Sequence, residues 1–105
     1  MEFFETDIFT KRIQDILSDE AYSFLQAVLI KKPDSGLLIP GAKGLRKLRW
    51  SVEGKGKRGG ARVIYYWYVG RERIYMIYAF KKSEQANLTH DQLEALAQYV
   101  QKGVL

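Results

Sequence analysis

The sequence lacks cysteine entirely and has a single histidine, His90, among its 105 residues. Without cysteine, the chain has no disulfide, no thiolate nucleophile and none of the common zinc clusters. One histidine cannot supply a multi-histidine metal site or a ribonuclease mechanism that uses two histidines. We therefore expect no metal and no cofactor, and any chemistry must depend on other side chains.

Long apolar runs are also absent. The chain has no stretch of about eighteen consecutive apolar residues, so we expect no segment that spans a bilayer. The N-terminal sequence, MEFFETDIFTKR, is acidic and lacks the basic and apolar regions of a signal peptide. The length of 105 residues predicts one domain, residues 1–105, and the 47% of hydrophobic residues indicates that it is folded. Without a predicted membrane span or signal peptide, we expect the chain in the cytoplasm.

Positive charge, by contrast, is concentrated in one window. Eight of the seventeen lysines and arginines lie between residues 43 and 62, where Glu53 is the one acid, so this window has a formal charge of +7 against +5 for the chain. Such a cluster indicates a polyanionic partner, because contacts with phosphates supply most of the non-specific affinity for nucleic acids. A basic surface that is simply hydrated is the alternative interpretation.

The first part of the chain predicts a short strand and two helices. Residues 2–6 favour a brief strand, and the apolar residues that follow at helical spacing predict a first helix with Asp7 or Thr10 as its N-cap. Ser18 is the predicted N-cap of a second helix, which Pro33 ends.

Residues 33–44, PDSGLLIPGAKG, have the composition of a loop. The apolar residues 37–39 within this loop have two interpretations. They close over the end of the second helix, which is the interpretation we favour, or they form part of a partner-binding surface.

Residues 45–50 alternate in the manner of a strand with one buried and one exposed face. Leu48 and Trp50 lie on one face, and Lys47 and Arg49 lie on the other.

Two more strands and a helix follow. Residues 61–69 and 74–80 are rich in β-branched and aromatic side chains, which predicts two further antiparallel strands. Residues 52–60 carry four glycines and three cations, which predicts a flexible basic hairpin loop. Residues 89–92 match a capping box, and residues 93–100 have the apolar spacing of a terminal helix.

The element order predicts an α+β domain with a short N-terminal strand, two helices, a three-stranded antiparallel meander and a C-terminal helix. We expect the helices to pack on one face of the sheet and to leave the other face partly open. Lys47 and Arg49 would point to this open face, and the hairpin would bring Arg62 near them. His90, in the first turn of the last helix, is expected to be exposed and without a role.

A face of this kind suits RNA cleavage. RNA carries its own nucleophile, the 2′-hydroxyl, so cleavage requires in-line geometry, stabilisation of negative charge and two proton transfers. Lys47, between Arg46 and Arg49, is the candidate general base, and Arg62 is the candidate bidentate clamp on the phosphate. The candidate proton donors are Lys81 and Lys82. Five tyrosines interleave with the strands, and we expect most of them in the core and any on the open face to stack a base: Tyr65, Tyr66, Tyr68, Tyr75 and Tyr78.

Several of these segments resemble the RelE/HigB superfamily of bacterial toxins, most closely its HigB-type branch. The resemblance rests on GLRKLR at 44–49, GKGKRGGARVIYY at 54–66, KKSE at 81–84 and the terminal helix. It implies a RelE-like fold and a ribosome-dependent messenger-RNA endonuclease that enters the ribosomal A site and cleaves through 2′-hydroxyl attack. It also implies a cognate antitoxin, usually a helix-turn-helix protein of the HigA type, besides the ribosome, its RNA and messenger RNA as partners.

The resemblance implies catalytic roles for Lys47, Arg49, Arg62 and Lys82. RelE has a tyrosine that stacks on substrate after the last strand, whereas Asn87 and Leu88 occupy that region here, and Arg49 is a poor base because arginine stays protonated. The remaining cations are expected to contact ribosomal or messenger RNA: Lys43, Arg46, Lys55, Lys57, Arg58 and Lys81.

Two alternatives differ in the reaction. A ParE-type toxin has the same architecture but acts on DNA gyrase, and the basic face argues against it. A non-catalytic RNA-binding module would need the cations only for affinity.

Overall fold

A computed structural model describes the backbone of residues 1–52 and 56–104 and the side chains of residues 1–51 and 60–103. The middle of the sheet is β4 (Gly56–Tyr68), which is apolar on both faces through the run VIYYW. It pairs antiparallel with β3 (Leu45–Val52) on one side and with β5 (Arg73–Lys81) on the other. The predicted three-stranded antiparallel meander is confirmed.

Two short strands extend this meander at its edges. β1 (Glu2–Glu5) pairs with β5 in parallel, and β2 (Leu37–Leu38) pairs antiparallel with β3 opposite Arg46 and Lys47. The result is a five-stranded mixed sheet in the order β1-β5-β4-β3-β2. The parallel strand β1 makes the sheet larger than the predicted meander.

The segment predicted as a loop, residues 33–44, therefore contains an edge strand. Leu37 and Leu38 are 77% and 58% exposed, so the interpretation that they close over the end of the second helix is wrong. Pairing with β3 holds their backbone instead. The chain then returns to β3 through Gly44, which has a positive φ of 98° and whose Cα lies so close to the Tyr66 ring that a Cβ would be 2.8 Å from it.

The helices begin at side-chain caps. α1 (Asp7–Ile16) is capped by Thr6, whose Oγ1 accepts a hydrogen bond of 3.0 Å from Phe9 N. The predicted caps Asp7 and Thr10 are wrong, because Thr6 Oγ1 also donates to Ile77 O of β5 at 2.8 Å and so fixes the start of the helix against the sheet.

The other two helices begin where the sequence predicts. Ser18 caps α2 (Asp19–Lys31), and Thr89 and Gln92 form a capping box at the start of α3 (His90–Tyr99). Single turns follow two elements: a 3-10 turn (Val69–Arg71) after β4 and a π-helical turn (Val100–Val104) after α3.

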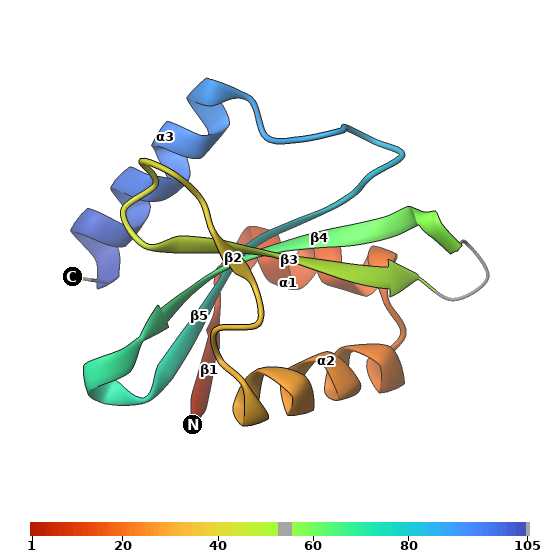
Figure 1. The fold of residues 1–105 in the computed structure, drawn as a ribbon, viewed down its shortest axis with the longest axis horizontal. Coiled ribbons are helices and arrows are strands. Elements are labelled where there is room, and N and C mark those ends of the chain that lie inside the picture. The colour runs from red at the N-terminus through yellow and green to blue at the C-terminus, as the bar shows by residue number, and fades with distance from the viewer. Residues whose placement is uncertain (53–55, 105) are drawn as a thin grey trace.

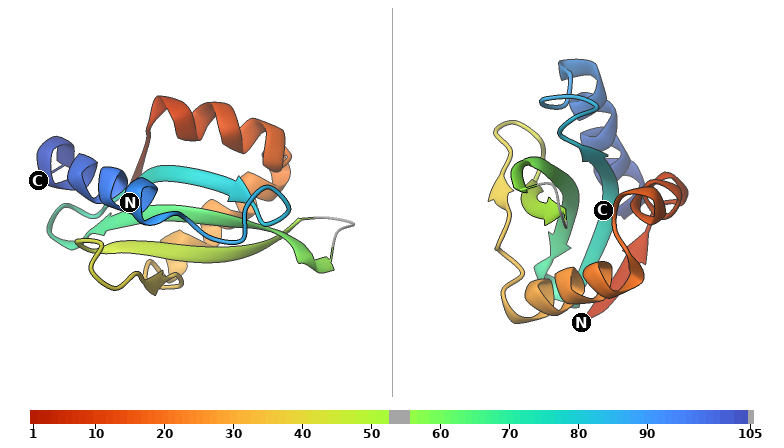
Figure 2. Two further views of the ribbon diagram at one scale, coloured as in Figure 1. Left: turned by 90° about the horizontal axis from the view of Figure 1, so that it is seen from above. Right: turned by 90° about the vertical axis from the view of Figure 1, so that its right-hand side faces the viewer.

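The helices cover both faces of the sheet, and the prediction that they share one face is wrong. α1 and α2 pack with Leu48, Val63 and Tyr65 on one face. α3 packs on the other face through Ala97, and Val100 just after it continues this contact. Figure 1 shows α3 and α2 on opposite sides of the strands, and Figure 2 shows α1 beside β5. The apolar stripe of α3 packs against buried apolar residues on this second face of the sheet: Leu45, Ile64, Ile77 and Phe80.

The hairpin between β3 and β4 is shorter than predicted. Val52 pairs with Gly56, so the backbone of Lys57 and Arg58 belongs to β4 rather than to a loop. Lys55 lies outside the described residues, as do the side chains of Lys57 and Arg58. Within the part of the chain that the structure describes, no helix is both long and apolar enough to cross a membrane.

Candidate nucleic-acid interface

The alternation of β3 and β4 brings two arginines together on the face that α3 partly covers. Arg49 lies directly opposite Arg62 in the antiparallel register. The Cβ atoms of such a pair are about 5 Å apart. Two like charges in this position repel each other, so the pair is suited to an anion that contacts both guanidinium groups.

Arg62 is the more deeply placed of the two. Its residue is 5% exposed, whereas Arg49 is exposed, and Arg62 Nη1 donates to the adjacent Ala61 O at 3.2 Å. Burial, and after it the positive charge of Arg49, lower the pKa of Arg62. An arginine in this setting still carries its charge at neutral pH, so Arg62 remains a buried cation.

A hollow of about 290 Å³ lies at this pair, lined by Arg49, Trp50, Ser51, Gly60 and Arg62. Lys82, directly after β5, belongs to the same end of the sheet, because its N–H donates to Gly60 O at 2.9 Å. Among the described side chains, those of residues 1–51 and 60–103, the three ion pairs involve none of these cations. We name this place the arginine hollow.

Lys47 lies two residues before Arg49 on the same face, opposite Ile64. Its side chain is half-buried, and Nζ donates to Asn87 Oδ1 at 3.2 Å. Asn87 Oδ1 also accepts from Leu88 N at 2.9 Å. A second hollow, of about 260 Å³, lies here between the β2 edge and the segment before α3. Asn87 thus binds the candidate base, a contact across 40 positions that no local pattern indicates.

Arg46 lies on the opposite face from Lys47. Its Nη1 donates to Gly36 O at 2.8 Å, on the side of the sheet that holds Tyr65. The expectation that the side chain of Arg46 lies beside those of Lys47 and Arg49 is therefore wrong. Neighbouring residues of a strand point to opposite faces, so the sequence itself already placed Arg46 on the face opposite Lys47. Arg46 holds the chain before β2 against the sheet.

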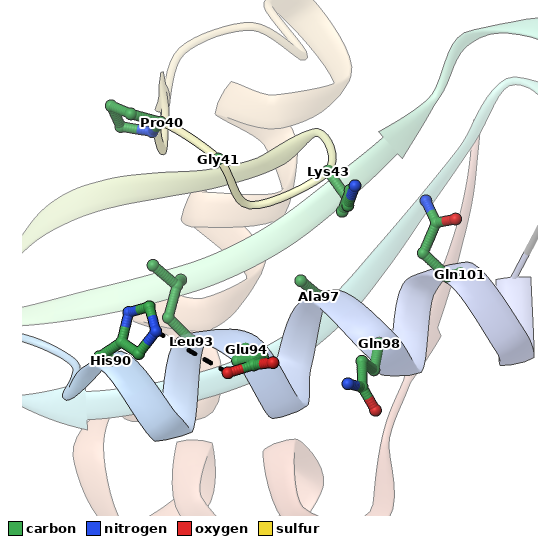
Figure 3. Close-up of a pocket in the computed structure, with 9 residues that line it drawn as sticks. All are labelled: Pro40, Gly41, Lys43, His90, Leu93, Glu94, Ala97, Gln98 and Gln101. Carbon is green, nitrogen blue, oxygen red and sulfur yellow. Dashed lines mark ion pairs between the residues drawn. The ribbon is translucent and has the colours of Figure 1, made fainter.

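Two further cations predicted to contact RNA lie away from the arginine hollow. Lys81 is opposite Ala61, on the face that α1 and α2 cover, and its N–H is bound by Glu84 Oε1 at 2.9 Å. Lys43 lies in the turn between β2 and β3 and lines a third hollow, of about 400 Å³, against α3 (Figure 3).

This third hollow is chemically different from the arginine hollow. Figure 3 shows Lys43 on one wall and His90, Glu94 and Gln98 on the other. His90 is exposed, as predicted, and its Nε2 is 3.8 Å from Glu94 Oε2. With one lysine facing a carboxylate, this hollow does not concentrate positive charge.

The tyrosines serve mainly the core, as expected. Tyr65 is fully buried on the face of α1 and α2, and Tyr66, Tyr75 and Tyr78 pack, half-buried, against the cluster beneath α3. Tyr68, also half-buried, forms a T-shaped pair with the Tyr66 ring, with the ring centroids 6.1 Å apart.

Comparison with known proteins bears on the whole chain. The family model described as RelE toxin of RelE / RelB toxin-antitoxin system matches residues 1–104. The chain belongs to the RelE toxin family. A solved structure of a mutant of the E. coli toxin RelE in the free state is similar to it, with a TM-score of 0.59 and 12% sequence identity over 92% of this chain and 93% of that one. This likeness confirms the RelE-like fold.

Membership in the RelE family confirms the superfamily inferred from the sequence and implies an antitoxin as partner. The assignment to the HigB-type branch stays a prediction. Within this RelE-family chain the structure brings Arg49 and Arg62 together and places Lys82 at the same end of the sheet and Lys47 two residues along β3.

Proposed function

We propose that this RelE-family chain is a ribosome-dependent endonuclease that cleaves messenger RNA and so inhibits translation. The observation that carries the proposal is the arginine pair, with the buried Arg62 directly opposite Arg49 in a hollow open to a ligand. A phosphodiester supplies the negative charge that this pair lacks. Family membership supports the toxin function and adds the ribosome as the expected setting.

The proposed reaction divides the work among four basic residues. Arg62 and Arg49 hold the scissile phosphate and stabilise the charge that develops on it. Lys47, acting as the neutral amine, takes the proton of the 2′-hydroxyl, and O2′ forms a bond to phosphorus while the bond from phosphorus to O5′ breaks. Lys82 gives a proton to the leaving O5′. The products are a 2′,3′-cyclic phosphate and a 5′-hydroxyl.

The position of Lys47 sets a condition on this reaction. Its Cα is two strand positions from that of Arg49, about 6.6 Å away, which is within the reach of a lysine side chain across a bound nucleotide. Its Nζ is bonded to Asn87 in the free protein. The amine must leave Asn87 to reach the ribose, so we expect substrate binding to break this hydrogen bond.

The partners follow from the same proposal. We place the chain in the cytoplasm, where it contacts ribosomal RNA through its basic hairpin and is inhibited by a cognate antitoxin of the helix-turn-helix, HigA-like kind. Co-purification with the product of a neighbouring reading frame tests this partner. A neighbour of another fold would contradict the HigB-type assignment and leave the reaction untouched.

The test of the reaction uses purified ribosomes programmed with a defined messenger RNA. We expect the natural chain to cut the message in the A site, and Lys47→Ala and Arg62→Ala each to slow cleavage by about 10²-fold or more. Lys11→Ala, which removes an exposed cation of α1, is the matched control and should cleave normally.

Three results would contradict the proposal in different ways. Cleavage that persists in the Lys47→Ala, Arg62→Ala double variant would exclude the assigned residues. DNA breaks without message cleavage would indicate a gyrase-directed toxin of the ParE type. RNA binding that weakens in Arg62→Ala, with no cleaved product from any chain, would indicate a non-catalytic module.

A further inference from the structure

A largely exposed aromatic side chain lies close to the arginine hollow. Phe24 of α2 is 65% exposed, more than any other aromatic residue among those described. Its ring lies 5.8 Å from that of Trp50 on β3, at 51°. Trp50 itself is half-buried against the core beneath α1 and α2. The fold therefore holds Trp50 in place and leaves Phe24 beside it, facing solvent.

These two rings border a hollow that continues into the arginine hollow. A space of about 420 Å³ is lined by Ala21, Phe24, Arg49, Trp50 and Ser51. Arg49, Trp50 and Ser51 also line the arginine hollow.

The three residues that the two hollows share lie on β3. The outer edge of β3 is unpaired at these residues, because among the described residues β2 pairs with Arg46 and Lys47 alone. A ligand bound to Arg49 and Arg62 on one face of the strand is thus adjacent to Phe24 and Trp50 on the other.

We propose that Phe24 and Trp50 stack an unpaired base of the RNA whose phosphate lies between Arg49 and Arg62. The inference rests on the proposed function and adds a base-binding site to it. A base flanking the bound phosphate needs an apolar surface, and aromatic rings accept any base because every base has a π-face. Arg49, which borders both hollows, binds the connecting phosphate. This cation favours RNA over an apolar protein segment as the occupant.

The segment between β5 and α3 supplies no aromatic side chain to the arginine hollow. It contains Asn87 and Leu88, and Asn87 is engaged with Lys47. In this chain the aromatic surface is supplied from α2 and β3, at the other side of the arginine pair.

The test combines a protein variant with a change in the substrate. Messenger RNAs with an abasic site at each position next to the cut are cleaved on programmed ribosomes by the natural chain and by Phe24→Ala. We expect Phe24→Ala to slow cleavage of the intact message roughly tenfold, and one abasic position to slow the natural chain equally. At that position Phe24→Ala should show no further loss, because the stacking partner is already gone. Phe24→Trp should restore the rate.

The matched control is Ile30→Ala, which removes a 55% exposed side chain from the same helix outside the hollow and should change nothing. The inference is overturned if Phe24→Ala cleaves as fast as the natural chain. It is also overturned if the decrease in cleavage rate caused by Phe24→Ala and that caused by the abasic site multiply at every position. Normal cleavage with weakened antitoxin binding would assign Phe24 to a protein contact instead.

A second measurement separates the base site from the reaction. With Trp67→Phe, Trp50 is the one remaining tryptophan, and its fluorescence is followed during titration with a short 2′-O-methyl RNA that cannot be cleaved. Saturable quenching that an abasic RNA fails to produce supports stacking even if no message is ever cut. If cleavage is absent and quenching is absent too, both the function and the base site are wrong.

Discussion

Arg62 combines two properties that oppose each other, because it is a permanent cation and it is 5% exposed. The one hydrogen bond of its side chain among the described residues goes to the neighbouring Ala61 O, and the side chain opposite it on β3 is another cation, Arg49. Burying a charge without a counter-ion costs stability. We therefore predict that arginine at this position serves ligand binding and does not stabilise the free fold.

Replacement of Arg62 tests this trade-off. Arg62→Met keeps the apolar stem and removes the charge, so we expect the free energy of unfolding to be unchanged or about 1 kcal/mol higher, while cleavage is lost. Urea unfolding followed by circular dichroism measures the first, and the ribosome assay measures the second. The control is the exposed Arg71→Met. A clear loss of stability in Arg62→Met would make Arg62 a structural residue.

Tyr65 differs from Arg62, because its buried polar group, the hydroxyl, makes hydrogen bonds inside the protein. It donates to Pro33 O at 2.6 Å and accepts from Gly36 N at 2.8 Å, which fixes the chain before β2. Burial raises the pKa of Tyr65. Tyr65→Phe leaves both backbone groups without this partner and should lower the free energy of unfolding by about 1–3 kcal/mol. Urea unfolding measures the loss; Tyr99→Phe, at an exposed position, should show none, and equal effects of the two would contradict the assignment.

Among the elements, α1 has a second task besides covering the core. β1 pairs with β5 only as far as Met76, and beyond it the β5 edge is closed by side chains of α1 and its cap. Thr6 Oγ1 donates to Ile77 O and Arg12 Nε donates to Ala79 O. Arg12 also lies over the Tyr78 ring, 5.1 Å from its centroid, and pairs with Glu84 at 2.8 Å. A sheet edge covered in this way cannot pair with another chain.

Glu84 makes this closure dependent on pH. The hydrogen bond from Lys81 N, and after it that from Arg12, lower the pKa of Glu84. A carboxylate with a lowered pKa in the folded state contributes stability above its ordinary value of about 4.5, and this contribution is lost as the pH falls through the lowered value.

Glu84→Gln should therefore be less stable than the natural chain at neutral pH and equal to it in acid. Thermal unfolding over this pH range measures the difference between the two. Asp15→Asn, at an exposed position of α1, should follow the natural curve throughout. A difference in melting temperature that stays constant with pH would show that the charge of Glu84 has no part.

The elements also show what the sequence can predict. β4 and the caps at Ser18 and Thr89 depend on neighbouring residues, so local patterns identified them. The face that α3 covers and the pairing partners of β1 and β2 depend on contacts far along the chain, and an apolar stripe does not say which apolar surface it meets.

The candidate site divides in the same way. Strand alternation placed Lys47 and Arg49 on one face, and hairpin register brought Arg62 opposite Arg49. The contact of Asn87 with Lys47 and the position of Phe24 beside Trp50 join separate elements, and no spacing in the sequence encodes them.

At the scale of the whole molecule, charge is distributed unevenly, with +7 between residues 43 and 62. Neutralising the hairpin cations in Lys55→Gln, Lys57→Gln, Arg58→Gln should weaken ribosome binding and reduce the slope of log affinity against log salt by about 2, since each phosphate contact contributes about 0.7–0.9. Arg62→Ala should leave the slope within about one contact of the natural value while it stops cleavage. Co-sedimentation with ribosomes at several salt concentrations measures the slope for both variants. If Arg62→Ala lowers the slope and the hairpin variant stops cleavage, the hairpin serves catalysis and the arginine hollow serves binding.

The parallel pairing of β1 with β5 has a consequence for synthesis. Thr6 bonds to Ile77 across 71 positions, and Phe3 pairs with Ile74. During synthesis β1 is therefore made long before its partner strand β5, and α1 has no sheet edge to close until β5 is made. Because Lys82, whose N–H binds Gly60 beside the arginine pair, comes later still, the nascent chain cannot assemble the candidate site until most of it has been translated.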